Sequence, residues 1–220
     1  MGDWTEIDTP HGRVRAWRAT PANGPHGALV LIQEIFAVNA HIRDVADRLA
    51  REGFDVVAPS LFDPVEAGVE LGYDDDGIAR GRELVAALGM EHAVDIVRAS
   101  ADAVRRTAHA VGAVGFCWGG SVALLANTRL GLPAVSYYGA RSVPFLDEPL
   151  RAPMMFHFGA RDHSIPPEQI ELHRRKLPTA EIHVYDAGHG FNCDRRVDYD
   201  AAAAAAAWAR SVAFLGSALA

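Results

Sequence analysis

The stretch that decides the fold is Gly115-Phe116-Cys117-Trp118-Gly119. An apolar run, residues 110–114, comes directly before it, and small and apolar residues, 120–126, follow it. This order predicts a strand, a sharp turn and a helix. Glycine at both outer positions lets neighbouring backbones approach closely, while the central residue takes strained dihedral angles. The pattern is that of a nucleophile elbow with cysteine in place of serine.

The elbow would give Cys117 unusual chemistry. Its sulfur is expected at a helix N-terminus, where partial positive charge favours a thiolate and backbone N–H groups can hold an oxyanion. Nucleophilic acyl transfer is therefore the first hypothesis. The pentapeptide alone would also fit a tight turn around a buried, inert cysteine. The strand and helix patterns on either side favour the reactive cysteine.

The composition is that of an ordinary globular chain. Half of the 220 residues are hydrophobic, 22% are charged, and the formal net charge is −7. We expect one domain, residues 1–220. Basic residues are dispersed, so we expect no nucleic-acid partner. Neither a long apolar run nor a secretion signal is present, so we expect a cytoplasmic protein with no membrane partner.

Short apolar runs alternate with helical patterns, which predicts an α/β fold with a mostly parallel central sheet and helices on both faces. A hairpin, residues 4–9 and 14–18, is expected to lead into the sheet. Helical periodicity marks residues 42–50, 91–109 and a closing helix from about residue 198, with Trp208, Val212, Leu215 and Leu219 on one face. The expected strands are residues 28–33, 54–59, 110–114, 134–139, 154–159 and 181–186.

Two further side chains follow strand ends, where ligands bind in open α/β sheets. Asp162 follows the strand ending at residue 159, and His189 lies between two glycines after the last strand. The order nucleophile, acid, histidine is that of α/β-hydrolases. Asp162 could instead cap the helix that starts near Pro166. His157, within a strand, is expected to be a core residue.

Two other kinds of site find little support. A disulfide between Cys117 and Cys193 would silence the elbow, and neither cysteine belongs to a small disulfide scaffold. No cluster of histidine and cysteine has the spacing of a metal site, so we expect no metal.

These motifs together resemble the dienelactone hydrolase (carboxymethylenebutenolidase) family. The resemblance extends over roughly residues 10–216. It implies a single α/β-hydrolase domain with little or no cap. The cysteine nucleophile and the Gln-Glu-Ile segment distinguish this family from serine esterases. The segments that carry the resemblance are 33–36, 58–62, 115–120, 159–162 and 188–192.

The resemblance implies a role for each polar residue of the motifs. Cys117 would be the nucleophile, His189 the base, and Asp162 the residue that orients the histidine. Glu34 would accept the thiol proton when substrate moves the sulfur toward His189, because a carboxylate beside a thiol cannot favour the thiolate by its charge. The alternative for Glu34 is a solvated loop glutamate.

The implied reaction is lactone or ester hydrolysis through a thioester, with dienelactone opening to maleylacetate. The backbone N–H groups of Ile35 and Trp118 would form the oxyanion hole. No cofactor is needed, and we expect a monomer that binds a small lactone or ester, which could be anionic.

Substrate recognition departs from the family pattern. Ile78 and Cys193 stand where the family has arginines that hold a substrate carboxylate, and arginines occur nearby in both cases. Either these arginines take over, or the substrate is not dienelactone. The candidate substrate-binding residues are Phe36, Arg80, Arg82, Tyr138, Arg195 and Arg196.

Three other functions stay open. The first is a general carboxylesterase or thioesterase acting on small acyl groups. The second is a noncatalytic, hydrolase-like protein that binds a ligand without turnover. The third is a redox or thiol-transfer protein using Cys117 and Cys193, which is weakened by the lack of a CxxC motif.

Overall fold

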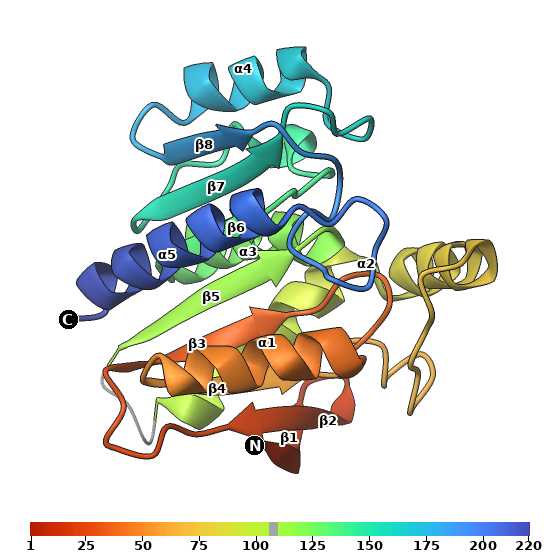
Figure 1. Cartoon of the computed structure of the whole chain (residues 1–220). Helices are drawn as coiled ribbons and strands as arrows, with labels where there is room; N and C mark the ends of the chain where they lie inside the picture. Colours follow the sequence, from red (N-terminus) through yellow and green to blue (C-terminus); the bar gives the residue numbers. More distant parts are fainter. Residues whose placement is uncertain (106–109) are drawn as a thin grey trace. The chain divides into compact units, whose positions relative to one another are not determined.

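The computed structural model describes residues 1–105 and 110–220 (Figure 1). By its internal contacts the chain divides into two compact units. The first consists of Met1–Gly112 with Leu219–Ala220, and the second of Ala113–Ala218. The expected single domain over residues 1–220 stays a prediction.

The first unit contains four strands in the order β1-β2-β4-β3. The pair β3 and β4 is parallel, whereas β2 runs antiparallel to both β1 and β4. Every residue of β3 and β4 is buried, as expected for unalternated apolar runs in a parallel sheet. The strands are β1 (Asp3–Thr9), β2 (Gly12–Ala19), β3 (Gly27–Ile32) and β4 (Phe54–Pro59).

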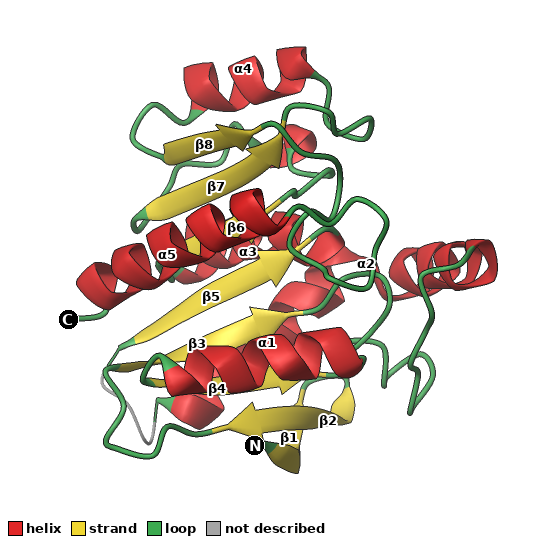
Figure 2. Ribbon diagram, in the orientation of Figure 1, coloured by secondary structure: helices red, strands yellow, loops and turns green. Residues whose placement is uncertain are grey.

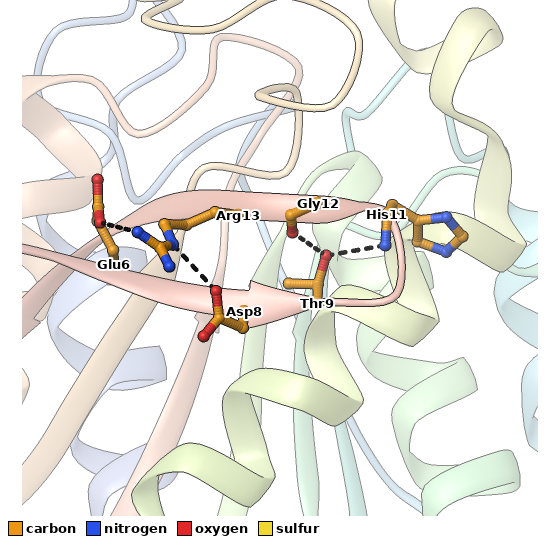
Figure 3. A network of polar contacts seen from close by, with 6 residues as sticks. All are labelled: Glu6, Asp8, Thr9, His11, Gly12 and Arg13. Atoms are coloured by element: carbon orange, nitrogen blue, oxygen red, sulfur yellow. Dashed lines mark hydrogen bonds and ion pairs between the residues drawn. The ribbon is translucent and has the colours of Figure 1, made fainter.

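The expected N-terminal hairpin is formed by β1 and β2 (Figure 3). The hydroxyl of Thr9 donates to the carbonyl of Gly12 at 2.6 Å and accepts from the His11 N–H at 3.1 Å, which closes the turn. Arg13 then joins Glu6 and Asp8 across the strands. These exposed charges protect an edge strand from pairing with another chain.

Helices lie on both faces of the first unit's strands (Figure 1), with α1 (Ala40–Arg51) in front and the C-terminal half of α2 (Asp75–Val104) behind. The side chain of Asn39 caps α1 by accepting from two backbone N–H groups. The helix predicted from residue 91 is part of α2, which begins earlier, at Asp75, and is kinked at Gly89. Of the predicted helix, residues 106–109 lie outside the described residues.

The second unit contains four parallel strands in the order β5-β6-β7-β8. Figure 2 shows α5 in front of these strands and α3 behind them. The expected α/β architecture with helices on both faces is thus confirmed in each unit. The expected parallel pairing holds for all strands of the second unit and for β3 with β4 in the first, whereas β1 and β2 add antiparallel pairs. The elements are β5 (Val111–Phe116), α3 (Trp118–Leu130), β6 (Ala134–Tyr137), the 3-10 turn η1 (Val143–Phe145), β7 (Met154–Gly159), α4 (Pro167–Lys176), β8 (Glu181–Tyr185) and α5 (Ala201–Ala218).

The closing helix differs from its prediction in the side chains that it buries. Its buried positions are three alanines, Ser211 and Leu215, whereas Trp208 and Val212 are only partly buried. Small side chains on this face let the helix approach the strands closely. Among the described residues, no helix is long and apolar enough to cross a membrane.

Candidate active site

The turn between β5 and α3 is a strained elbow. Cys117 has φ 53° and ψ −120°. Residues that carry a side chain rarely adopt this conformation. A Cβ atom added to Gly115 would lie 1.9 Å from the carbonyl oxygen of Gly119, so only glycine fits there. The N–H of Cys117 donates to the carbonyl of Tyr137 at 2.9 Å, which ties the turn to the end of β6.

Cys117 occupies the N-cap position of α3. Its side chain makes no capping hydrogen bond, and the residue is partly exposed. Trp118 is the first residue of the helix and its side chain is buried. Backbone N–H groups of a first helical turn point toward the cap and carry partial positive charge. The sulfur is therefore beside groups that stabilise negative charge.

Three loops of the second unit bring Cys117, His189 and Asp162 together. The Nε2 atom of His189 lies 3.2 Å from the Sγ atom of Cys117. Its Nδ1 atom lies 2.7 Å from the Oδ2 atom of Asp162. With Nδ1–H donating to the carboxylate, Nε2 faces the sulfur, as a base that takes the thiol proton must.

Asp162 is held rigidly for this contact. Its side chain is fully buried, and Oδ1 accepts from the N–H of Ser164 at 2.8 Å while Oδ2 faces His189. The alternative that Asp162 caps α4 is wrong, because the N-cap of α4 is Pro166. Oδ1 is thus engaged within the loop that follows β7, and Oδ2 by His189 in the loop that follows β8.

The environment of His189 favours its charged form. Burial lowers the pKa of the imidazole, but the charge of Cys117 and the hydrogen bond to Asp162 outweigh burial and raise it to about 10. Both negatively charged partners therefore favour the imidazolium form of His189. An imidazolium in contact with the sulfur is the partner that a thiolate needs.

Charged side chains flank the His189 loop. A Cβ atom on Gly190, which has φ 82°, would lie 2.7 Å from the Cζ atom of Arg196. One on Gly188 would lie 2.7 Å from a carboxylate oxygen of Asp198. The guanidinium of Arg196 therefore lies against the backbone next to His189, which makes Arg196 the predicted arginine best placed near the triad residues of this unit.

The other predicted arginines are in different surroundings. Arg80 is partly exposed and forms ion pairs with Glu66 and Glu83, so its charge is already balanced. Arg82 and Arg195 are exposed.

Tyr138 is fully buried at the end of β6, although it was predicted to line a substrate pocket. Its ring centroid lies 5.2 Å from that of His189, and it packs edge-on against Phe191 at 5.3 Å. Phe36, predicted for the same pocket, is also buried, in the first unit, with its ring 4.5 Å from that of Tyr73.

Glu34 lies in the first unit just after β3 and is fully buried. The hydroxyl of Tyr73 donates to its Oε2 atom at 3.3 Å and accepts from the side-chain amide of Asn39 at 3.1 Å. The alternative of a solvated loop glutamate is therefore wrong. The role of Tyr73 could not be predicted, because a loop sequence does not indicate which distant side chain a tyrosine will contact.

The backbone around Glu34 is also fixed. The side chain of Gln33 donates to the carbonyl of Glu34 and accepts from the N–H of Leu61. The carbonyl oxygen of Ile35 would be 2.4 Å from a Cβ atom on Gly81, so α2 packs tightly beneath this loop. The cysteines form no disulfide, so the alternative of a Cys117–Cys193 bridge is wrong.

Comparison with known proteins agrees with these features. The model of the dienelactone hydrolase family matches residues 14–219. The chain is 33% identical over 214 residues to the carboxymethylenebutenolidase of Pseudomonas putida, a match over 89% of this chain and 88% of that protein.

Two solved structures are similar in fold. One, from Klebsiella pneumoniae subsp. pneumoniae MGH 78578 and provisionally named a dienelactone hydrolase, has a TM-score of 0.85 and 32% identity, with 97% of each chain covered. The other, a dienelactone hydrolase-like promiscuous phosphotriesterase from metagenomic libraries, has a TM-score of 0.81 and 20% identity, with 99% of this chain and 98% of that chain covered. The chain belongs to the dienelactone hydrolase family and is a hydrolase of ester or lactone bonds.

Proposed function

We propose that the protein opens a small lactone, with dienelactone as the first candidate, through a covalent thioester on Cys117. The observation that carries the proposal is the continuous contact from Cys117 to His189 to Asp162. The family name and that of the relative from Pseudomonas putida support this substrate class.

In the first half of the reaction, the Cys117 thiolate attacks the carbonyl carbon and the C–S bond forms. The N–H of Trp118 and, from the family resemblance, that of Ile35 stabilise the oxyanion. The ring C–O bond then breaks, and His189 gives its Nε2 proton to the leaving oxygen. In a lactone this oxygen stays in the same molecule, so nothing is released at this stage.

In the second half, neutral His189 takes a proton from water, and the hydroxide attacks the thioester carbonyl. The C–S bond breaks, the carboxylic acid formed releases its proton to solvent and leaves as the carboxylate, and the thiolate with its imidazolium partner is restored. Asp162 keeps Nδ1 protonated throughout, so Nε2 alone exchanges protons. For Glu34 we propose that it accepts the proton of Cys117 in those molecules in which Cys117 is still a thiol when substrate binds; this role rests on the family resemblance alone.

Arg196 is the proposed ligand of a substrate carboxylate, because its guanidinium lies against the backbone that follows His189. Removing it in Arg196→Met should raise KM for an anionic lactone roughly tenfold, the loss expected for a charge-assisted hydrogen bond. A neutral aryl ester should be cleaved as before. Arg195→Met, at the exposed neighbouring position, is the matched control. An equal loss in both variants would contradict a specific role for Arg196.

The nucleophile is tested with purified protein and its Cys117→Ala variant, following the loss of dienelactone absorbance and the cleavage of an aryl acetate. Cys193→Ala, which changes the other cysteine, is the control. Turnover of dienelactone that disappears only in Cys117→Ala supports the proposal. Cleavage of the aryl ester alone keeps the mechanism but discards dienelactone as substrate and points to a general esterase. Turnover by Cys117→Ala would show that the nucleophile is another group.

A further inference from the structure

Tyr138 has a backbone conformation that needs an explanation. Its φ is 41°, in the left-handed region. Bulky residues avoid this region, and such a strained conformation persists only where the surrounding structure imposes it. The conformation is held on both sides. The N–H of Tyr138 donates to the carbonyl of His157 at 2.8 Å, and a Cβ atom on the next residue, Gly139, would lie 2.9 Å from backbone of Gly120 in α3.

The result of this conformation is a ring beside the histidine. The side chain of Tyr138 is fully buried, with its ring centroid 5.2 Å from that of His189 and 6.1 Å from that of Phe116. Phe191 packs edge-on against the same ring at 5.3 Å. Neighbours on several sides thus hold Tyr138 in one place, and the histidine ring rests against it.

We propose that Tyr138 is a positioning residue, whose ring holds the His189 imidazole in line between Cys117 and Asp162 and favours its protonated form. An aromatic ring attracts a cation that lies over its face within about 6 Å of the ring centre, and the His189 ring centroid lies 5.2 Å away. The proposal rests on the proposed function of the Cys117 and His189 pair. It assigns Tyr138 an action through His189 in place of the substrate contact suggested by the sequence.

The other ionisable groups around His189 set the background for this effect. Within residues 113–218, His189 faces the thiol of Cys117, at the start of α3, and the carboxylate of Asp162, after β7. Arg196 and Asp198 lie against the two glycines that flank it. None of these groups changes when Tyr138 is replaced, so a shift in the pH dependence reports the ring.

The test is the rate of alkylation of Cys117 by iodoacetamide between pH 5 and pH 12, read by mass spectrometry of the peptide that carries it. The reaction needs the thiolate but no substrate, so it gives an answer even if the protein does not hydrolyse lactones. Tyr138→Leu should move the alkaline midpoint, at which the imidazolium of His189 loses its proton and the alkylation rate changes again, downward by about half a pH unit, the size expected for a lost cation–ring attraction. Tyr138→Phe keeps the ring and should restore the wild-type midpoint.

Tyr199→Leu, at an exposed position of the same unit, controls for loss of a tyrosine as such. If Tyr138→Leu does not fold, phenylalanine and 3,4,5-trifluorophenylalanine at position 138 give rings of similar shape but different charge distribution, and the fluorinated ring should lower the alkaline midpoint. Unchanged midpoints in a folded Tyr138→Leu, or equal midpoints for the two rings, would overturn the proposal. Where an aryl ester is hydrolysed, kcat should fall several-fold in Tyr138→Leu with KM unchanged.

Discussion

At the scale of single residues, the distances around His189 indicate a different role for each of three side chains. The imidazole has one nitrogen toward a buried carboxylate and the other toward sulfur. In the proposed mechanism, Cys117 supplies the nucleophile only while that arrangement persists. Asp162 never contacts the sulfur, so its effect on the reaction must pass through the tautomer and the charge of His189.

The substitution Asp162→Asn should therefore impair catalysis while leaving the fold intact. The neutral amide lacks the negative charge with which the Asp162 carboxylate raises the pKa of His189, and it no longer fixes the proton on Nδ1. We therefore expect kcat/KM to fall on the order of 10³-fold to 10⁴-fold. The measurement is kcat/KM for an aryl ester, with circular dichroism as a check on folding. Asp186→Asn, at an exposed aspartate after β8, should retain activity. A loss of less than tenfold in Asp162→Asn would contradict the assigned role.

At the scale of elements, a buried polar network joins α5 to the strands of the second unit. The hydroxyl of Ser211 lies 2.7 Å from that of Tyr137 and 2.9 Å from the Nε2 atom of His157. The Nδ1 atom of His157 lies 2.9 Å from the hydroxyl of Tyr185, which also accepts from Arg210. Serine on an otherwise alanine-rich helix face is thus the group that connects this helix to β6 and β7.

The substitution Ser211→Ala should lower the free energy of unfolding by about 1–3 kcal/mol, because it leaves buried partners without their hydrogen bonds. Urea denaturation measures the change. Ser217 is an exposed position of the same helix. Its replacement in Ser217→Ala should change stability by only about 0.5 kcal/mol or less. Equal effects of the two substitutions would show that the network contributes nothing.

The elbow makes a second prediction about elements. Gly115→Ala places a methyl group 1.9 Å from a backbone oxygen, so strand and helix must separate. The cost should be about 1–3 kcal/mol or more, with loss of activity. A Cβ atom on Gly216 in α5 meets open space. Gly216→Ala should therefore stabilise the protein by about 0.5–1 kcal/mol.

Thermal unfolding of Gly115→Ala and Gly216→Ala tests whether the first substitution destabilises the protein and the second stabilises it. A Gly115→Ala protein as stable as wild type would contradict the packing described for the elbow.

At the scale of the whole molecule, two histidines set opposite limits on stability. Burial, with the charges of His183 and Arg210, lowers the pKa of His157 from 6.5 to about 3. Between these two pH values, His157 therefore binds a proton in the unfolded chain but not in the folded one. The contribution of His157 is fully present above pH 6.5 and lost as the pH falls toward 3. The raised pKa of His189 acts in the other direction, and its contribution is lost as the pH rises from 6.5 through 10.

The urea midpoint should accordingly be highest near pH 6.5 and decline on both sides. Each histidine contributes up to about 1.4 kcal/mol per pH unit within its range. His157→Gln should flatten the acid side, and His189→Gln the alkaline side. A His157→Gln protein whose stability still falls as steeply as wild type between pH 6 and pH 4 would show that other groups dominate there.

Much of this architecture could be predicted because the patterns that specify strands, helices and the elbow lie in short, continuous stretches of sequence. Unalternated apolar runs indicated the buried strands, and residues 115–119 fixed the elbow. The first half of α2 was missed because Gly77 and Gly81 lower helix propensity, although the close approach of Ile35 explains the glycine at 81.

Contacts between distant loops could not be predicted. Nothing in the sequence distinguishes Arg196, which lies against Gly190, from its exposed neighbour Arg195. Likewise, a strand pattern gives the face of a residue but not the turn that follows, so the contact between the rings of Tyr138 and His189 could not be predicted. The positive φ of Tyr138 redirects its ring toward His189.

The contact between Cys117 and His189 spans 72 residues of chain. During synthesis the ribosome adds the cysteine long before the histidine, so the growing chain holds an ordinary thiol without its cationic neighbour. Peroxide attacks thiolates much faster than thiols. We therefore expect the sulfur to become vulnerable to oxidation only when translation of the last loops lets the pair assemble, which makes the newborn chain chemically safer than the finished enzyme.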